Sequence, residues 1–418
     1  MINKIETLNF RCLQYVHQEL DSFHVLVGPN ASGKTTFLDV VRFLGILVSD
    51  GLEAAVREWT PNFDDLLFNR KGEAFELALE FKIPPERQKK TKRPEMDLMR
   101  YEIRIGKDEE GVTSIIEERA FLKKSKKGEP MQRTLFPAMV TPPDTIFEKC
   151  PAKSTKRVLT KKKGGNDNWY SEVKETGTGW FPSIKLGNRK STLGNLPDDE
   201  NEFPVSTWMK QLLIEGVQFF ILNSQTIRRS SPPGQPKRFK PDGSNLPWVV
   251  HELRNNRDKS LYEQWIAHLQ TALPDLEEVE TVELPDTRHR YLMLVYKGNL
   301  RVPSWMASDG TLRLLALTLP AYLPDFEGVY LIEEPENGIH PLAMECVYQA
   351  LSSVYDAQIL MASHSPVVLS TAKPEQVLCF KKNELGATDI VSGSEHPNLR
   401  NWQGEADMGT LLAAGVLG

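Results

Sequence analysis

Residues 28–36, GPNASGKTT, have the types and spacing needed to bind phosphate groups. They form the pattern G-x-x-x-x-G-K-T between an apolar run at residues 23–27 and an amphipathic stretch. The glycines let the loop curl so that backbone N–H groups point at phosphates, and a following helix adds a partial positive charge. The lysine can reach the β- and γ-phosphates, and the first threonine can ligate Mg²⁺. The pattern therefore predicts binding of ATP and Mg²⁺ by Gly28, Pro29, Asn30, Ala31, Ser32, Gly33, Lys34, Thr35 and Thr36.

Two carboxylates end an apolar run later in the chain. Residues 328–332, GVYLI, predict a buried strand, and Glu333 and Glu334 follow it directly. Carboxylates at the end of such a strand cost free energy unless they hold a cation or water. We expect Glu333 to hold Mg²⁺ through water and Glu334 to polarise the water that attacks the γ-phosphate.

Two further polar motifs lie on either side of these carboxylates. Residues 358–362 predict another buried strand, and His364 follows it in the sequence S-H-S-P. His364 could bond a γ-phosphate, or it could be an ordinary polar residue at a strand end. The turn at residues 308–311, S-D-G-T, opens an apolar helix, and Ser308 is suited to be its N-cap, which needs no further function.

The order of these motifs resembles the nucleotide-binding head of ABC-type ATPases, in the branch of the RecF, SMC and OLD (overcoming-lysogenisation-defect) proteins. The resemblance covers residues 1–81 and about 212–385. It implies an α/β P-loop NTPase fold with a mixed sheet and a helical lobe. It also implies that Ser308 and Gly310 belong to a signature turn, which reaches the γ-phosphate held by a partner subunit. Residues 333–341 resemble the Walker B end and the D-loop.

The same resemblance implies a mechanism. Two heads meet face to face, ATP joins them, and hydrolysis releases them, so the output is a conformational switch. Lys34, Glu334 and His364 would be the catalytic residues, with His364 as the switch histidine. Arg11, in the opening Asn9-Phe10-Arg11, could lie near the nucleotide or could be a surface charge.

The sequence departs from the pattern at two places. Glutamate replaces the usual aspartate at Glu333, and no glutamine occurs between residues 37 and 81, where a transporter ATPase has its Q-loop. Gln225, after an apolar run at residues 218–222, is the substitute that we expect. OLD-type proteins often carry a TOPRIM nuclease domain, for which the residues after His364 are too few. Any nuclease or toxin output is therefore expected from a partner.

Several elements must position these residues. Strands are expected at residues 2–10, 23–27, 74–81 and 218–222, with the first two opening one sheet, and a strand pair at 281–284 and 291–296. One helix is expected to open at residues 33–35, with apolar positions between 37 and 44. Others are expected at 53–59, 212–217, 242–254 and 260–269. The domains predicted are residues 1–81 and 211–385 as two halves of one ATPase head, 82–210 as an insertion, and 386–418 as a tail.

The predicted insertion is basic. Residues 82–190 hold 26 lysines and arginines against 15 aspartates and glutamates, whereas the formal net charge of the whole chain is −5. The segment could be a solvated insertion, or a surface for DNA or an acidic partner through clusters such as Lys161, Lys162 and Lys163. The apolar end of the tail, residues 411–418, could pack on the head or dock a partner.

The cysteine content and the distribution of charged residues limit the compartment and the kind of protein to be expected. The four cysteines lie too far apart for a zinc pattern or a disulfide framework, which favours a reducing cytosol and a cytoplasmic protein. No leader and no uncharged run of membrane-spanning length is visible. Three functions stay open: an ATPase switch in DNA repair or phage defence, acting as a homodimer or higher homo-oligomer; an ATP-dependent scaffold that sequesters a partner; and a transporter ATPase subunit.

Overall fold

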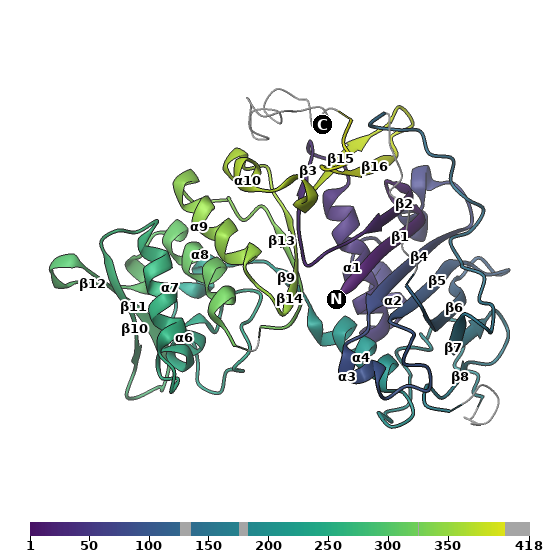
Figure 1. The fold of residues 1–418 in the computed structure, drawn as a ribbon, viewed down its shortest axis with the longest axis horizontal. Helices are drawn as coiled ribbons and strands as arrows, with labels where there is room; N and C mark the ends of the chain where they lie inside the picture. Colours follow the sequence, from purple (N-terminus) through teal and green to yellow (C-terminus); the bar gives the residue numbers. More distant parts are fainter. Residues whose placement is uncertain (126–134, 175–182, 325, 398–418) are drawn as a thin grey trace.

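The computed structural model describes residues 1–125, 135–174, 183–324 and 326–397. In Figure 1 a seven-stranded sheet lies at the right, a lobe of helices with a three-stranded sheet lies at the left, and a six-stranded sheet lies between them. The fold is α/β with mixed sheets, as the sequence predicts.

The seven-stranded sheet is antiparallel throughout, in the order β2-β1-β4-β5-β6-β7-β8. Its strands are β1 (Ile2–Phe10), β2 (Leu13–Glu19), β4 (Ala74–Lys82), β5 (Leu98–Lys107), β6 (Thr113–Lys123), β7 (Thr155–Lys162) and β8 (Asn168–Trp169).

The six-stranded sheet has the order β16-β15-β3-β14-β13-β9, and only β16 runs antiparallel to its neighbour. Its strands are β3 (Phe23–Val27), β9 (Val217–Phe220), β13 (Gly328–Glu333), β14 (Ala357–Ala362), β15 (Val377–Lys382) and β16 (Thr388–Ser392). Because five neighbouring strands are parallel, their carboxyl ends meet at one edge, where loops from distant parts of the chain come together.

The six-stranded sheet separates two hydrophobic cores. All five residues of β3 are buried, and alternate residues face opposite sides of the sheet. Leu26 packs in the core shared with the seven-stranded sheet and with α1 (Lys34–Asp50), whereas Val25 and Val27 pack in the core of the helical lobe. Continuous burial explains why four of its five residues are apolar, with the buried His24 as the exception.

The helical lobe holds the three-stranded sheet β10 (Leu276–Glu283), β11 (Arg290–Tyr296) and β12 (Leu300–Pro303), which is antiparallel. The main helices of this lobe are α5 (Ser224–Ile227), α6 (Leu246–Arg254), α7 (Ser260–Gln270), α8 (Asp309–Thr318), α9 (Pro341–Ser352) and α10 (Pro366–Thr371). The remaining α-helices are α2 (Leu52–Arg57), α3 (Pro85–Gln88) and α4 (Pro204–Gln211). Short helical turns complete the described elements: η1 (Phe63–Leu66), η2 (Phe68–Arg70), η3 (Leu212–Gly216), η4 (Lys297–Asn299), η5 (Ser304–Met306), η6 (Leu319–Tyr322) and η7 (Pro374–Gln376).

Most predicted elements are present within a few residues of their expected bounds, including the β10–β11 pair, where Val282 lies opposite Tyr291. One expectation was wrong. We expected the first two strands to open a single sheet, but β1 and β3 lie in different sheets. The physical reason is burial: β3 is covered on both faces, whereas β1 contains half-buried as well as buried residues and forms a hairpin with β2.

The basic segment is folded into the head rather than attached beside it. β5 pairs with β4 along its whole length, so the boundary predicted at residue 82 falls within one continuous sheet. Lys161 is buried, and its ammonium group donates to Asp167 Oδ1 at 2.6 Å. It therefore does not belong to a surface cluster with Lys162 and Lys163, contrary to the expectation from sequence.

Residues 411–418 lie outside the described residues, and so does much of the predicted tail. In the part of the chain that the structure describes, no helix combines the length and the apolar character that a membrane span requires.

Candidate functional site

A cavity of about 490 Å³ opens at the carboxyl edge of the six-stranded sheet. It brings together the predicted phosphate loop and residues more than 300 positions further along the chain. The lining residues are Arg11, Cys12, Asn30, Ala31, Ser32, Gly33, Lys34, Thr35, Thr36, Glu333, Glu334, Ala362, His364 and Lys382.

The phosphate loop needs its two glycines for packing as well as for curvature. Gly28 and Gly33 have φ of 148° and 106°, in the region that disfavours side chains. A Cβ at Gly28 would lie 2.2 Å from the Phe380 carbonyl oxygen, and one at Gly33 would lie 2.3 Å from Thr388 Oγ1. The Thr388 hydroxyl donates to the Ser32 carbonyl at 2.8 Å. The hairpin of β15 and β16 therefore supports the loop from behind.

Lys34 is the first residue of α1 and is buried. Its ammonium group donates to the carbonyl oxygens of Gly28 at 2.8 Å and Pro29 at 3.0 Å. Burial lowers the pKa of Lys34, and the nearby charges of Glu334 and Glu333 oppose that shift. The cation thus lies beside the loop whose backbone would hold phosphate groups.

Glu333, the last residue of β13, is suited to a cation. Burial raises its pKa, a hydrogen bond from Thr35 acts in the opposite direction, and the charges of Asp39 and Glu334 raise it further. Within the described residues, the buried Glu333 Oε1 has no hydrogen-bond partner. A carboxylate oxygen without a partner, next to a threonine hydroxyl, is a donor set of the kind that Mg²⁺ takes beside phosphate groups. The residues therefore fit the ion.

Glu334 is held in an unusual conformation next to it. Its φ is 46°, a left-handed conformation that costs a non-glycine residue about 1–3 kcal/mol. Two hydrogen bonds hold it: the Glu334 N–H donates to the Ala362 carbonyl at 2.8 Å, and Asn337 Nδ2 donates to Glu334 Oε2 at 2.7 Å. The carboxylate stays exposed at the cavity, as a group that polarises water must.

Sequence reasoning missed Glu336, which joins two of the motifs. Its carboxylate accepts from the His364 N–H at 2.5 Å and from Ser363 Oγ at 3.0 Å. The carboxylate therefore fixes the turn that carries His364 into the cavity. Burial and the charge of Lys34 lower the pKa of His364, whereas the charges of Glu336 and Glu334 act in the opposite direction, so the net shift favours the neutral imidazole. The run E-E-P-E-N was visible in the sequence, but nothing in it separates the third carboxylate from a surface charge.

Arg11 lies at the cavity, as one of its two sequence interpretations requires. It follows β1 with φ of 52°, and its guanidinium pairs with Asp39 of α1 at 2.5 Å. Cys12 and Lys382 also line the cavity and were not predicted, because no motif marks them.

Gly28 and Pro29 of the phosphate loop do not line this cavity, and three predicted residues outside the loop do not line it either. Ser308 Oγ caps α8 by accepting from the Thr311 N–H at 3.1 Å, as predicted for the helix start. Gly310 lies so close to the D-loop that a Cβ there would be 2.5 Å from the Gly338 carbonyl. Gln225 lies at the start of α5, exposed, with its N–H bonded to Asn223 Oδ1 at 3.0 Å. The chain thus does not bring its own signature turn to its own phosphate loop.

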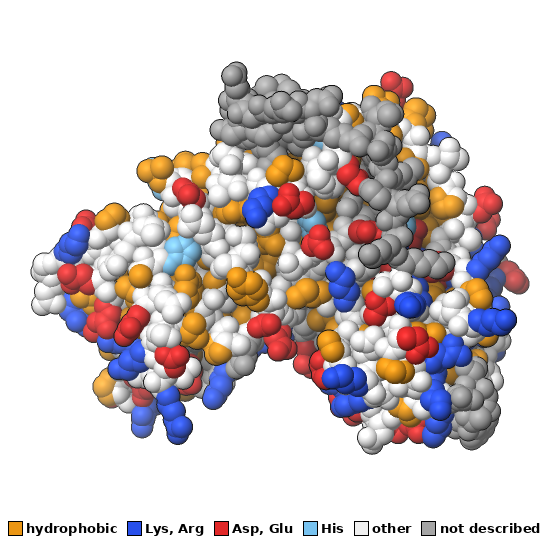
Figure 2. Space-filling view, in the orientation of Figure 1, with side chains coloured by type: hydrophobic (Ala, Val, Ile, Leu, Met, Phe, Trp, Pro, Cys, Tyr) orange, Lys and Arg blue, Asp and Glu red, His pale blue; other side chains and the backbone are white. Residues whose placement is uncertain are grey.

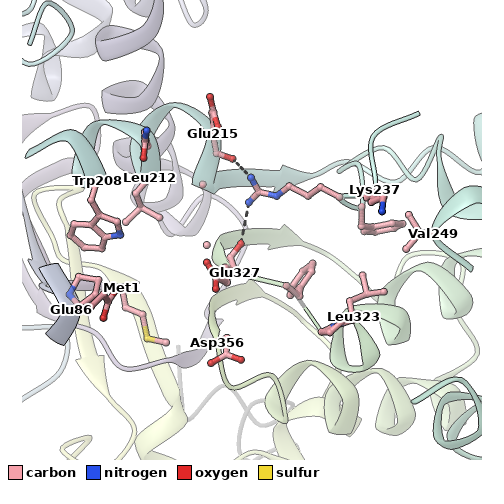
Figure 3. Close-up of a pocket in the computed structure, with 18 of the residues that line it drawn as sticks. Met1, Glu86, Trp208, Leu212, Glu215, Lys237, Val249, Leu323, Glu327 and Asp356 are labelled. Carbon is pink, nitrogen blue, oxygen red and sulfur yellow. Dashed lines mark hydrogen bonds between the residues drawn. The ribbon is translucent and has the colours of Figure 1, made fainter. Parts of the chain in front are cut away.

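A larger cleft of about 1,260 Å³ lies at the opposite, amino edge of the same sheet. Figure 2 shows the hollow between the two lobes, and Figure 3 shows Glu215 and Glu327 among the residues that line the cleft. Arg238 donates to the backbone carbonyls of Glu215 at 2.8 Å and Glu327 at 3.0 Å. No sequence motif maps to this cleft.

Comparison with protein families agrees with this geometry. Residues 157–370, just over half of the chain, match the family described as "AAA domain, putative AbiEii toxin, Type IV TA system". The chain belongs to this AAA-domain family. Residues 1–174 match a second family, described as "AAA ATPase domain". The two matches overlap in β7 and β8, so no part of the basic segment lies outside a matched region.

Solved structures with a similar fold include two SMC heads. One is the SMC head bound to the C-winged helix domain of ScpA, with a TM-score of 0.53, 12% identity, and coverage of 94% of this chain and 97% of that chain. The other is an SMC head with an extended coiled coil bound to the C-terminal domain of ScpA, derived from Pyrococcus furiosus. Its TM-score is 0.51 at 12% identity, over 94% of this chain and 96% of that chain. No curated protein sequence matches the chain. The AAA-domain member therefore has the fold of an SMC-like P-loop ATPase head.

Proposed function

We propose that this AAA-domain protein is an ATP-driven switch, in which two copies pair through ATP and separate on hydrolysis. The observation that carries the proposal is the position of the signature turn. Ser308 and Asp309 are exposed and lie outside the cavity that holds the phosphate loop of the same chain. A second copy placed against that cavity would supply the missing turn.

Five residues of the cavity have a role in this proposal. Lys34 binds the β- and γ-phosphates, and Thr35 and Glu333 would hold Mg²⁺, which would supply positive charge beside the phosphates. Glu334 orients and polarises the attacking water, and His364 bonds the γ-phosphate. The lowered pKa of His364 favours the neutral imidazole, which can donate one hydrogen bond without adding charge.

The output is proposed to reach a separate effector, either a nuclease or a toxin from the same operon, or DNA. The resemblance to RecF and OLD proteins supports a role in DNA repair or phage defence, and the description of the matched family names a toxin–antitoxin system. The two SMC heads are each bound to part of ScpA, which supports partner binding by a head of this fold. Exposed cations such as Lys153, Arg157 and Lys162 support DNA as a partner.

The test is the oligomeric state of Glu334→Gln, which should bind ATP and hydrolyse it slowly. Light scattering after size exclusion should give a monomer with ADP and a dimer with ATP and Mg²⁺. A variant with Ser308→Arg, which places a bulky charge on the signature turn, should stay monomeric while it retains ATP. A Glu334→Gln chain that retains ATP and stays monomeric at all concentrations would contradict the proposal.

The same variant separates the switch from a scaffold. A scaffold that only sequesters a partner would keep its partner binding and its biological output in Glu334→Gln. A switch would form trapped dimers and lose its output. Retained output together with trapped dimers would therefore favour the scaffold.

A further inference from the structure

The segment after β9 connects the edge of the six-stranded sheet to the signature turn. β9 lies beside β13, with Phe220 opposite Ile332, so β9 ends next to the strand end that carries Glu333. From there residues 221–231 run through α5 into the helical lobe. The segment therefore starts at the nucleotide edge of the sheet and ends beside η5 and α8.

Arg228, the residue after α5, makes the main contacts at that end. Its Nε and Nη2 atoms donate to the same oxygen, Asp309 Oδ1, at 3.1 and 2.5 Å. Nη1 donates to the Trp305 carbonyl at 3.2 Å, and Ser304 Oγ donates to the Arg228 carbonyl at 3.0 Å. Asp309 is the second residue of the signature turn, so one guanidinium holds both the turn and the η5 segment that precedes it.

A second arginine makes the connection in the reverse direction. Arg313 on α8 donates from Nε to Ser224 Oγ at 3.3 Å and from Nη2 to the Leu222 carbonyl at 3.5 Å. On the other side of the turn, Gly310 packs against the Gly338 carbonyl. The signature turn thus lies between two segments. The segment after β9 is on one side, and the D-loop at Gly338, two residues after Glu336, is on the other.

We propose that Arg228 is a positioning residue, which sets the orientation of the signature turn toward the nucleotide of a second copy. The inference rests on the proposed ATP-dependent pairing. The guanidinium is a planar group with several fixed donors, so it defines direction as well as distance, which a lysine cannot do. Its side chain is largely covered whereas that of Asp309 is half exposed, so the arginine is the fixed partner and the turn is the part that it orients.

The test is a double-mutant cycle with Arg228→Ala, Asp309→Ala and the double variant, all in the Glu334→Gln background. Each single change should weaken ATP-dependent dimerisation by roughly tenfold, and the double variant should be no weaker than either single variant. ATP binding by the monomer should stay within about twofold of the parent, because neither residue lines the cavity. Arg228→Lys should restore little of the loss, since it cannot make three directed hydrogen bonds.

Arg229→Ala is the matched control, because this neighbouring arginine is exposed and its side chain has no hydrogen bond or ion pair among the residues that the structure describes. It should dimerise like the parent. Additive losses in the double variant, or equal losses in Arg229→Ala, would overturn the role of Arg228.

A second measurement does not depend on pairing. Hydrogen exchange of residues 305–312 in the nucleotide-free monomer should be faster in Arg228→Ala than in the parent, and unchanged in Arg229→Ala. If the Glu334→Gln parent never pairs, the proposed function fails, and this exchange still decides whether Arg228 orders the turn. Unchanged exchange in Arg228→Ala would overturn the inference.

Discussion

The two cavities at opposite edges of the six-stranded sheet differ in what the chain brings to them. At the carboxyl edge, a smaller cavity collects a glycine-supported loop, a lysine, two consecutive glutamates and a histidine. At the amino edge, a cleft more than twice as large is lined by charges of both signs with no motif among them (Figure 3). The larger size of the amino-edge cleft therefore does not make it the better candidate for the proposed nucleotide site. The arrangement of parallel strands favours the carboxyl edge, because the carboxyl ends of the strands meet loops and helix N-termini.

The largest expected difference between the two cavities is in ATP binding. Lys34→Ala removes the cation at the phosphate loop and should weaken ATP binding by roughly 100-fold, because a buried phosphate charge loses its partner. Lys237→Ala, at the amino-edge cleft, should change binding by less than about twofold. Isothermal titration calorimetry measures both. Equal losses in the two variants would mean that the carboxyl-edge cavity is not the nucleotide site.

Variants at the two edges of the sheet should differ in their rate of ATP hydrolysis nearly as strongly as in ATP binding. Glu334→Gln removes the carboxylate that polarises water and should lower turnover by roughly 100-fold, with ATP affinity retained. Glu327→Gln, a carboxylate change at the amino-edge cleft, should leave turnover unchanged. Phosphate release under single-turnover conditions measures the chemical step. Normal turnover in Glu334→Gln would assign the water-activating role to another group.

Glu336→Gln should have an intermediate effect. The amide keeps one acceptor but places a donor against the Ser363 hydroxyl or the His364 N–H, so the turn that carries the histidine loosens. Turnover should fall by roughly tenfold, since hydrogen bonds to charged groups contribute about 1.5–3 kcal/mol. Hydrogen exchange at residues 363–365 should speed up. Glu345→Gln, an exposed change on α9, is the control and should alter neither quantity.

The smallest effect is expected on stability and its dependence on pH. Burial raises the pKa of Glu333 above 4.5 in the folded chain. Between pH 4.5 and that raised pKa, the carboxyl group is protonated in the folded chain and ionised in the unfolded chain. The contribution of Glu333 to the free energy of unfolding is therefore greatest below about pH 4.5, and it is lost as the pH rises through the folded pKa. Without nucleotide and Mg²⁺, Glu333→Gln should unfold at a higher temperature than the parent at pH 7, and the gap should close toward pH 4. Calorimetric scans at the two pH values test this, and a lower unfolding temperature for Glu333→Gln at pH 7 would contradict it.

Parts of this site could be predicted from the sequence because they consist of residues that are neighbours along the chain. The phosphate loop is nine consecutive residues between a strand and a helix, and β13 is an apolar run that ends in two carboxylates. The cap at Ser308 is equally local. Contacts between distant segments were not readable. Glu336 holds the His364 turn and Arg228 pairs with Asp309 across 81 positions, and no spacing rule links such residues.

The basic segment shows the same division. The net charge of the segment could be calculated from the sequence. Charge alone did not reveal that Lys161 pairs with Asp167 in the interior, or that β5 pairs with β4 in one sheet. Alternation of polar and apolar residues predicts a strand, yet it does not say which strand lies beside it, because pairing depends on the whole sheet.

The sequence by itself determined the α/β fold, the loop G-x-x-x-x-G-K-T between a strand and a helix, and two carboxylates at the end of a buried strand, because each follows from residues that are neighbours along the chain. Only the tertiary structure decided that Arg11, Lys382 and His364 share one cavity, and that Ser308 does not reach it. The order of the strands and the packing of the layers place these residues relative to one another. This arrangement follows from the burial of both faces of β3 between two separate cores.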